Sequence, residues 1–171
     1  MILNQNFAEG EHGWHKTHAD GYNTHYRVYS ADYCRSTELP MFSTKIFSEM
    51  DNQHLYTCSR AKKEHVFVDE TQVSGWYRVM RGYVPVYRLK PFEYLTNSEF
   101  LKSVSSFVSY NHPDLLSQML AFDRSISIVG KSIDKLIDKA IDARYHECYL
   151  ILLNWKNEYD LYTNPLDKLK L

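Results

Sequence analysis

The sequence predicts an α+β protein in which a small, mostly antiparallel β-sheet half is followed by a helical half. Two observations predict this order. Short runs of aromatic and β-branched residues, separated by turn residues, occupy the chain before residue 95. Beyond that point, apolar residues recur at three- and four-residue steps, which is the helical period. We therefore expect a tyrosine-rich β-sheet domain with one helix over residues 1–94 and a helical-hairpin domain over residues 95–171, which could also pack as one unit.

In the first half, strands are expected at residues 24–30, 55–59 and 64–69, with a further candidate at residues 1–7. Residues 75–80 and 83–89 flank Arg81-Gly82 and are expected to form a hairpin, because glycine can take a positive φ. Pro85 has no N–H to donate, so its strand is expected at a sheet edge or a bulge.

Between these strands the sequence predicts one helix and two turns. Residues 39–50 are expected to be helical, because five side chains there supply a buried face: Met41, Phe42, Ile46, Phe47 and Met50. Residues 61–63 and 70–74 are expected to be turns.

The second half predicts two pairs of helices. Residues 99–110 and 113–122 form the first pair, with Ser98 as the expected N-cap, and residues 123–130 are expected to be a loop. The stretch 131–159 then forms two helices around a polar break at residues 142–147. The second of these helices is apolar on most of its surface, so it is expected to be the inner one.

Composition excludes several classes of function. Hydrophobic residues make up 44% and charged residues 24% of the 171 residues, and the formal net charge is −1. No global charge therefore favours nucleic acid or an anionic membrane. No apolar run is long enough to span a bilayer and no signal peptide is visible, so we expect no membrane partner. The three cysteines are far apart and form no CxxC pair, which favours a reducing, cytoplasmic location.

No motif for catalysis is recognisable. A P-loop, GxGxxG, GxSxG and HExxH are all absent from the sequence. Cys34 or Cys58 could pair with an N-terminal histidine as a nucleophile, but such pairs arise in any chain with this many cysteines and histidines.

Four histidines near the N-terminus are the other candidates for chemistry, namely His12, His15, His18 and His25. They could hold a metal ion or form an acid–base pair that cleaves RNA. No cysteine or carboxylate lies beside them at a ligand-like spacing, so a solvated polar loop is the favoured interpretation. We expect no cofactor and no metal, and the sequence favours a non-enzymatic protein over an enzyme.

Tyrosine and arginine supply the strongest sign of binding. Most of the 14 tyrosines lie in the first half, where they alternate with arginines on the expected strands. Such residues are enriched at protein interfaces. We expect the binding residues to be Tyr26, Arg27, Tyr29, Trp76, Tyr77, Arg78, Arg81, Tyr83 and Tyr87. Arginines with stacking aromatics also hold single-stranded nucleic acid, but neighbouring acidic residues dilute this patch.

The second half contains an internal repeat. With an offset of 33 residues, the first helical pair aligns with the second and matches residues of similar character. The aligned pairs are Val104 and Ile137, Val108 and Ile141, Asp114 and Glu147, Met119 and Leu152, Leu120 and Leu153, and Phe122 and Trp155. Self-similarity at a fixed period is the signature of stacked helical repeats.

Residues 140–156 resemble an ankyrin repeat, with a short first helix, a loop, an acidic residue and an apolar second helix. The resemblance covers residues 98–160 and implies stacked helix-turn-helix units. The T-P-L-H opening is absent at residues 132–136, and Arg144 or Tyr145 stands where ankyrin loops have glycine. The alternative is a plain four-helix layer with the same spacing.

Residues 54–90 resemble the closing strands of C-type-lectin-like modules of bacterial and phage proteins. The likeness lies in the order of a tyrosine-bearing strand, a short strand that ends in Asp69, a turn with glycine, and a final strand from Gly82. This resemblance implies a binding domain.

Together these features predict a non-enzymatic module that binds another protein. Its size and the lack of enzyme motifs fit a small inhibitor from a phage or mobile element that acts on a host defence system, such as an anti-CRISPR protein. The alternative is a protein that binds nucleic acid, or cleaves RNA, with the N-terminal histidines and the arginine–tyrosine face.

Overall fold

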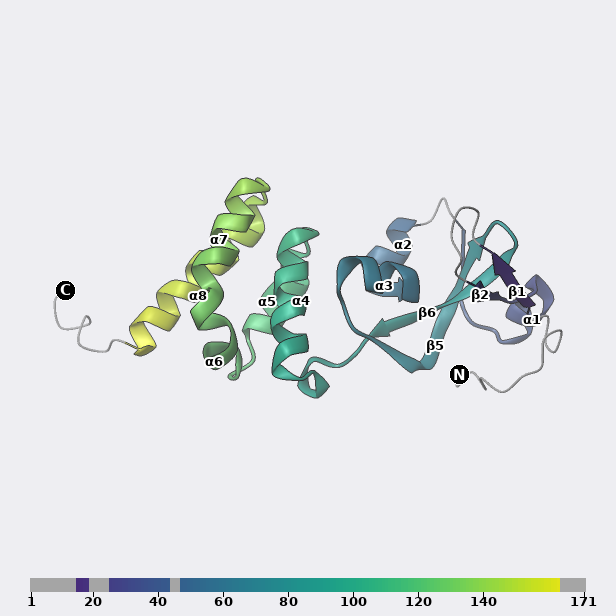
Figure 1. Cartoon of the computed structure of the whole chain (residues 1–171), viewed down its shortest axis with the longest axis horizontal. Helices are drawn as coiled ribbons and strands as arrows, with labels where there is room; N and C mark the ends of the chain where they lie inside the picture. The colour runs from purple at the N-terminus through teal and green to yellow at the C-terminus, as the bar shows by residue number, and fades with distance from the viewer. Residues whose placement is uncertain (1–14, 19–24, 44–46, 164–171) are drawn as a thin grey trace. The chain divides into compact units, whose positions relative to one another are not determined.

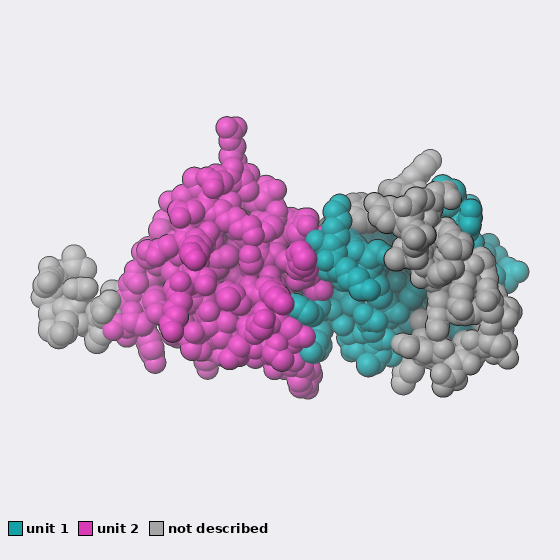
Figure 2. All heavy atoms as spheres, in the orientation of Figure 1, with its two compact units in different colours: residues 1–63, 67–91 teal, residues 64–66, 92–171 magenta. Residues whose placement is uncertain are grey.

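The computed structural model describes residues 15–18, 25–43 and 47–163. The expected α+β class is confirmed, with a β-sheet followed by helices along the chain (Figure 1). Two compact units are present, and each is described by itself. Residues 1–63 and 67–91 form the first unit, and residues 64–66 and 92–171 form the second (Figure 2). The strand expected at residues 1–7 and the histidine at position 12 lie outside the described residues.

The first unit is built on a four-stranded sheet. Its strands are β3 (Met41–Phe42), β4 (Leu55–Thr57), β5 (Val68–Val79) and β6 (Gly82–Leu89), in the order β3-β5-β6-β4. The pair β3 and β5 is parallel, and the other two pairs are antiparallel. A second sheet pairs β1 (His15–His18) with β2 (His25–Val28), and helices α1 (Ala31–Ser36), α2 (Phe47–Asn52) and α3 (Cys58–Glu64) complete the elements.

The hairpin of β5 and β6 confirms the prediction made from Arg81-Gly82. Gly82 has a φ of 155°, and a Cβ at this position would lie 2.8 Å from the carbonyl oxygen of Tyr29. This close approach lets Tyr29 and Tyr83 exchange two backbone hydrogen bonds of 2.9 and 3.0 Å. Glycine is therefore required here for both its conformation and its lack of a side chain.

Pro85 lies in a strand with a neighbour on each side, so the edge position expected for it is wrong. Strand β6 pairs with both β5 and β4. However, β4 ends at Thr57 opposite Val86, and the nitrogens of Tyr83 and Pro85 point to the same side of the strand. Pro85 therefore falls in the gap between the Tyr29 bridge and the end of β4, where no N–H has to be donated.

Four local predictions in this unit are wrong. The strand expected at residues 64–69 begins only at Val68, because residue 64 still belongs to α3. Residues 39–50 divide into β3 and α2, because the N–H of Trp76 donates to the carbonyl of Pro40 at 2.8 Å and holds the next two residues against β5. The expected turn at 61–63 lies inside α3. The expected turn at 70–74 lies inside β5, which absorbs it through register shifts between Val68 and Gly75.

The second unit is helical. It contains the short 3₁₀ helices η2 (Phe92–Tyr94) and η3 (Gly130–Ser132), and the helices α4 (Asn97–Ser109), α5 (Pro113–Leu120), α6 (Ser125–Val129), α7 (Ile133–Asp142) and α8 (His146–Thr163). Both expected helical pairs are confirmed. The loop expected at 123–130 is wrong, because α6 occupies most of it. No helix in the described part of the chain has the length and apolarity needed to cross a membrane.

Two contacts fix the start of this unit. Thr96, and not Ser98 as expected, caps α4: its hydroxyl accepts from the N–H of Glu99, whose carboxylate accepts from the N–H of Thr96. Arg124 donates to the carbonyls of Phe92 and Leu95, and its guanidinium lies 4.6 Å from the centre of the Phe100 ring. These contacts hold the segment before α4 against the helices.

Candidate functional site

Three of the predicted binding residues belong to the core of the first unit. Tyr29, Trp76 and Tyr87 have exposed fractions of 3%, 0% and 6%. The Trp76 ring packs 5.0 Å from that of Tyr29, and its Nε1 donates to the hydroxyl of Thr37 at 2.8 Å. These side chains hold the sheet against α1 and present almost no area to a partner.

Four other predicted residues, Tyr77, Arg78, Arg81 and Tyr83, are more accessible but do not share one face. Arg78 lies opposite Tyr83 across the β5–β6 pair, on the same side of the sheet as Trp76. Tyr77 points to the other side, where it packs against a buried cluster made by Phe42, Met50, Leu55 and Val86. Arg78 and Arg81 are exposed, and Tyr77 and Tyr83 are half-buried. Tyr26 and Arg27 belong to β2, where their backbones pair with residues 17 and 16; their side chains are not described.

The tip of the β5–β6 hairpin carries one exposed apolar side chain. Met80 is 90% exposed, and it lies between the exposed Arg78 and Arg81 in sequence. The tip is therefore the most accessible part of the surface predicted from the arginines and tyrosines.

The cysteines are poorly suited to act as nucleophiles. Burial raises the pKa of Cys34 to about 12, and burial together with the carboxylates of Glu147 and Asp114 raises the pKa of Cys148 to about 11. The pKa of Cys58 is also raised, first by burial and then by the charge of Glu70. A thiol with a raised pKa is almost entirely protonated near neutral pH, so it is a weak nucleophile.

Where the structure describes the histidine-rich segment, the chain forms strands and not the loop expected for it. His15 and His18 begin and end β1, and His18 pairs with His25 of β2, although the side chains are not described. Among the described residues, no three histidine, cysteine or acidic side chains lie close enough to hold a metal ion. In the second unit, His112 Nε2 is 3.6 Å from Glu64 Oε2, and both atoms are buried, although the His112 side chain forms no capping hydrogen bond with α5.

The 33-residue repeat recurs in the backbone of the second unit. The loop after α4 has Asn111 at a φ of 55°, and the loop after α7 has Arg144 at 59°. The N–H of His112 donates to the carbonyl of Phe107 at 2.8 Å, and that of Tyr145 donates to the carbonyl of Ala140 at 2.9 Å. Three further loop hydrogen bonds recur with the same offset, from residues 110, 111 and 116 and from residues 143, 144 and 149. The two helical hairpins therefore share one loop geometry.

The second hairpin stacks on the first. Helix α7 contacts α4, and α8 contacts α5. Lys139 Nζ donates to the hydroxyl of Ser105 at 3.0 Å, and Trp155 Nε1 donates to the carbonyl of Leu120 at 3.2 Å. Apolar and polar contacts thus join the two hairpins along their length.

Equivalent positions of the two hairpins differ in burial. In the first hairpin Val104, Val108, Leu116 and Leu120 are buried, with exposed fractions of 5% or less. Their counterparts 33 residues later are all more exposed: Ile137, Tyr149 and Leu153 are half-buried and Ile141 is 53% exposed. We call the surface made by Ile137, Ile141, Tyr149 and Leu153 the end face. It occupies the positions at which a further hairpin would stack.

This arrangement corrects the expectation that α8 is an inner helix. Its buried residues, Cys148, Leu152 and Trp155, follow a single stripe, and Leu150 is 41% exposed. The run of apolar residues at the start of α8 therefore covers two surfaces, one against the first hairpin and one on the end face. The 33-residue repeat in the sequence already aligned the residues of the end face with buried residues of the first hairpin. Only the exposed fractions in the structure show that these residues are accessible in the second hairpin.

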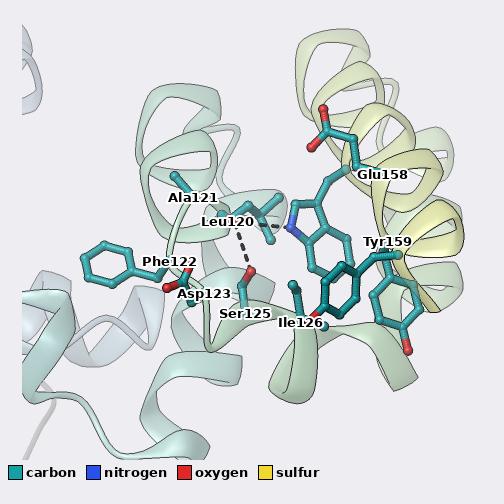
Figure 3. A pocket seen from close by; sticks show the side chains of 10 residues that line it. Leu120, Ala121, Phe122, Asp123, Ser125, Ile126, Glu158 and Tyr159 are labelled. Carbon is teal, nitrogen blue, oxygen red and sulfur yellow. Dashed lines mark hydrogen bonds between the residues drawn. The ribbon is translucent and has the colours of Figure 1, made fainter.

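A pocket of about 300 Å³ lies at the other end of α8 (Figure 3). Trp155, Tyr159 and Tyr162 line it from α8, and the acidic residues Asp123 and Glu158, which come from two different segments, are also among its lining residues. The rings of Trp155 and Tyr159 stack at 5.4 Å with an angle of 9°. A Cβ on Gly130 would lie 2.6 Å from Tyr159 Cζ, so glycine makes room for the tyrosine ring.

No family model matches this chain, and neither a curated protein nor a solved structure matches it. The resemblances to ankyrin repeats and to C-type-lectin-like modules therefore stay predictions.

Proposed function

We propose that this protein is a non-enzymatic protein-binding module whose interface is the end face. The observation that carries the proposal is the contrast between Val108, which is 0% exposed, and its counterpart Ile141, which is 53% exposed. In repeat arrays each unit buries its apolar face on a neighbour, and terminal units normally present a polar outer face. The end face keeps apolar side chains at the stacking positions instead.

The expected occupant is a helical segment of another protein that offers an apolar stripe. The end face repeats the surface of the first hairpin that already accepts α7 and α8, so a helix is the element that fits it. Full burial of one isoleucine or leucine side chain contributes about 1.5–3 kcal/mol, and several such side chains lie together here. Covering the end face would therefore supply a substantial part of the binding free energy.

Charge favours a protein partner over nucleic acid. Exposed residues of both signs surround the end face, among them Lys135, Asp138, Asp142 and Arg144. In the first unit three of the aromatic rings that could stack on bases, those of Tyr29, Trp76 and Tyr87, are buried. A nucleic-acid surface needs a basic patch or accessible aromatic rings.

An inhibitor of a host defence system is the finer form of this proposal. It rests on the size of the chain and on thiols that are poorly suited to catalysis. It predicts that the captured partner is a defence protein whose activity falls when the end face is occupied.

The proposal is tested by affinity capture with three versions of the tagged chain: the parent, Ile141→Lys and Met80→Lys. The two substitutions make the same change at exposed apolar residues, one on the end face and one at the hairpin tip. We expect a protein that resists nuclease treatment to bind the parent and Met80→Lys and to bind Ile141→Lys at least about tenfold less, a loss of about 1.4 kcal/mol.

Three results would overturn the proposal. Loss of capture with Met80→Lys alone would assign the interface to the arginine–tyrosine surface. Loss of the partner after nuclease treatment, with a steep decrease in binding as salt rises, would favour nucleic acid. A homodimer in sedimentation experiments that Ile141→Lys dissociates would assign the end face to a second copy of the chain.

A further inference from the structure

The pocket at the C-terminal end of α8 is separate from the end face and has its own chemistry. Its lining combines three aromatic side chains with two carboxylates, and no lysine or arginine is among the lining residues in the described part of the chain. Arg124 follows the lining residue Asp123 in the sequence, but its guanidinium group donates to the carbonyls of Phe92 and Leu95. The lining therefore carries negative charge without a cation of its own.

Neither carboxylate of the pocket is neutralised by the described residues. Asp123 and Glu158 are both exposed, and no ion pair or hydrogen bond of either side chain is found in the described part of the chain. Lys156, which is close to Glu158 in sequence, pairs with Asp134 at 2.5 Å. Asp123 follows α5 and Glu158 belongs to α8, so the two acidic residues of the lining come from different elements and lie on different sides of the aromatic rings (Figure 3).

Two hydrogen-bond donors of the pocket are already in use. Trp155 Nε1 and the Ser125 hydroxyl both donate to the carbonyl of Leu120, at 3.2 and 2.9 Å (Figure 3). An anion would therefore meet two carboxylates and no free indole N–H. A cation would meet negative charge and the faces of aromatic rings, which attract cations through their quadrupoles.

We propose that this pocket binds a monovalent organic cation, an alkylammonium or guanidinium group carried on an apolar stem. Its volume of about 300 Å³ is at the lower end of the range for small-ligand sites, which fits a head group of this size. Tyr159 stacks on Trp155 and is held there by the absence of a side chain at Gly130, so the aromatic wall is formed before the ligand arrives. This inference does not depend on the end face.

The test follows the indole N–H resonances of the three tryptophans in the full chain. The Trp155 signal is assigned with Trp155→Phe, and Trp76, which is buried in the other unit, serves as an internal reference. The probes are tetramethylammonium and the peptide Gly-Arg-Gly, which distinguish a free cation from a side chain of a protein. Their neutral counterparts are neopentane-type alcohols and Gly-Gln-Gly, and sodium chloride matches the ionic strength.

We expect at least one of the two cations to shift the Trp155 signal while the neutral counterparts leave it unchanged. The variant Asp123→Asn with Glu158→Gln should weaken this binding about tenfold, whereas Asp160→Asn, an exposed carboxylate of α8 outside the pocket, should change it less than about twofold. Equal shifts by the neutral compounds, unchanged affinity in the double variant, or no shift of Trp155 by either cation would each overturn the inference. Because both substituted side chains are exposed, the double variant is expected to keep the helical circular dichroism and the urea midpoint of the parent's helical unit, which checks its fold.

Discussion

The α4–α5 hairpin and the α7–α8 hairpin close with the same loop hydrogen bonds, yet their equivalent side chains meet different surroundings. Val108 is fully buried between packed helices, and Ile141, at the same position of the repeat, is 53% exposed. Backbone geometry in the two hairpins is set by short-range contacts within about ten residues. Burial is set by what stacks on the hairpin, and the second hairpin has a neighbour on one side only among the described residues.

A repeated apolar pattern therefore has two structural roles in this chain. In the first hairpin it builds the core, and in the second it leaves the end face accessible. A sequence pattern that predicts burial therefore also predicts a binding surface wherever the array stops without a polar cap.

The largest expected effect comes from two leucines at equivalent positions. Leu120 is 5% exposed, and its counterpart Leu153 is half-buried. Leu120→Ala should lower the free energy of unfolding by about 2–5 kcal/mol, because it leaves a cavity in the core, and Leu153→Ala by less than about 1 kcal/mol. Urea denaturation measures both. Leu152→Ala is the control on the same helix, and since Leu152 is fully buried it should behave like Leu120→Ala. If Leu120→Ala and Leu153→Ala lowered the free energy of unfolding equally, the two hairpins would not differ in burial as described.

A second difference concerns pH, because Cys148 stands where the first hairpin has Leu115. Burial keeps the folded thiol neutral and raises its pKa from 9.0 to about 11. Below pH 9 the thiol is protonated in both states. Between about 9 and about 11 the unfolded chain loses its proton first, so the free energy of unfolding falls as pH rises, by on the order of 2 kcal/mol.

Cys148→Ala should therefore flatten the alkaline decrease in stability of the helical unit, measured by urea denaturation with helical circular dichroism below and above this pH window. Cys34→Ala is the matched control, because Cys34 is a buried thiol of the first unit. It should leave the transition of the helical unit unchanged. The same decrease in the parent and in Cys148→Ala would contradict the pKa assigned to Cys148.

The smallest expected effect distinguishes the two loops. Arg144 and Asn111 both adopt positive φ values, which asparagine tolerates better than arginine. Arg144→Gly should raise the free energy of unfolding by about 0.5–1 kcal/mol, and Asn111→Gly should change it by only a few tenths. The urea midpoints of the two variants provide the measurement. A larger gain from Asn111→Gly than from Arg144→Gly would show that the loops are not equivalent.

Much of the helical unit could be predicted from the sequence, because helices α4, α5, α7 and α8 follow from local apolar spacing. The β5–β6 hairpin followed in the same way from one glycine. Elements that depend on distant partners could not be predicted. Strand β3 exists because Trp76 donates to Pro40, and α3 replaces a charged segment that looked like a turn.

The candidate sites also depend partly on local sequence patterns and partly on contacts between distant residues. Tyrosine and tryptophan are common both in cores and at interfaces, so the sequence could not separate Trp76, which is buried, from residues such as Arg78, which is exposed. The aromatic wall of the pocket did leave a signal, since Trp155, Tyr159 and Tyr162 follow helical steps of four and three residues. Its carboxylate Asp123 is more than thirty residues away, and only the fold brings it to the pocket.

The most direct test of the end face is amide hydrogen exchange of the captured complex compared with the free chain. We expect the partner to add protection to peptides from α7 and from the first half of α8, around Ile141, Tyr149 and Leu153. Peptides from the β5–β6 hairpin should exchange as they do in the free chain. Protection confined to that hairpin, with α7 and α8 unchanged, would contradict the account and place the interface on the arginine–tyrosine surface.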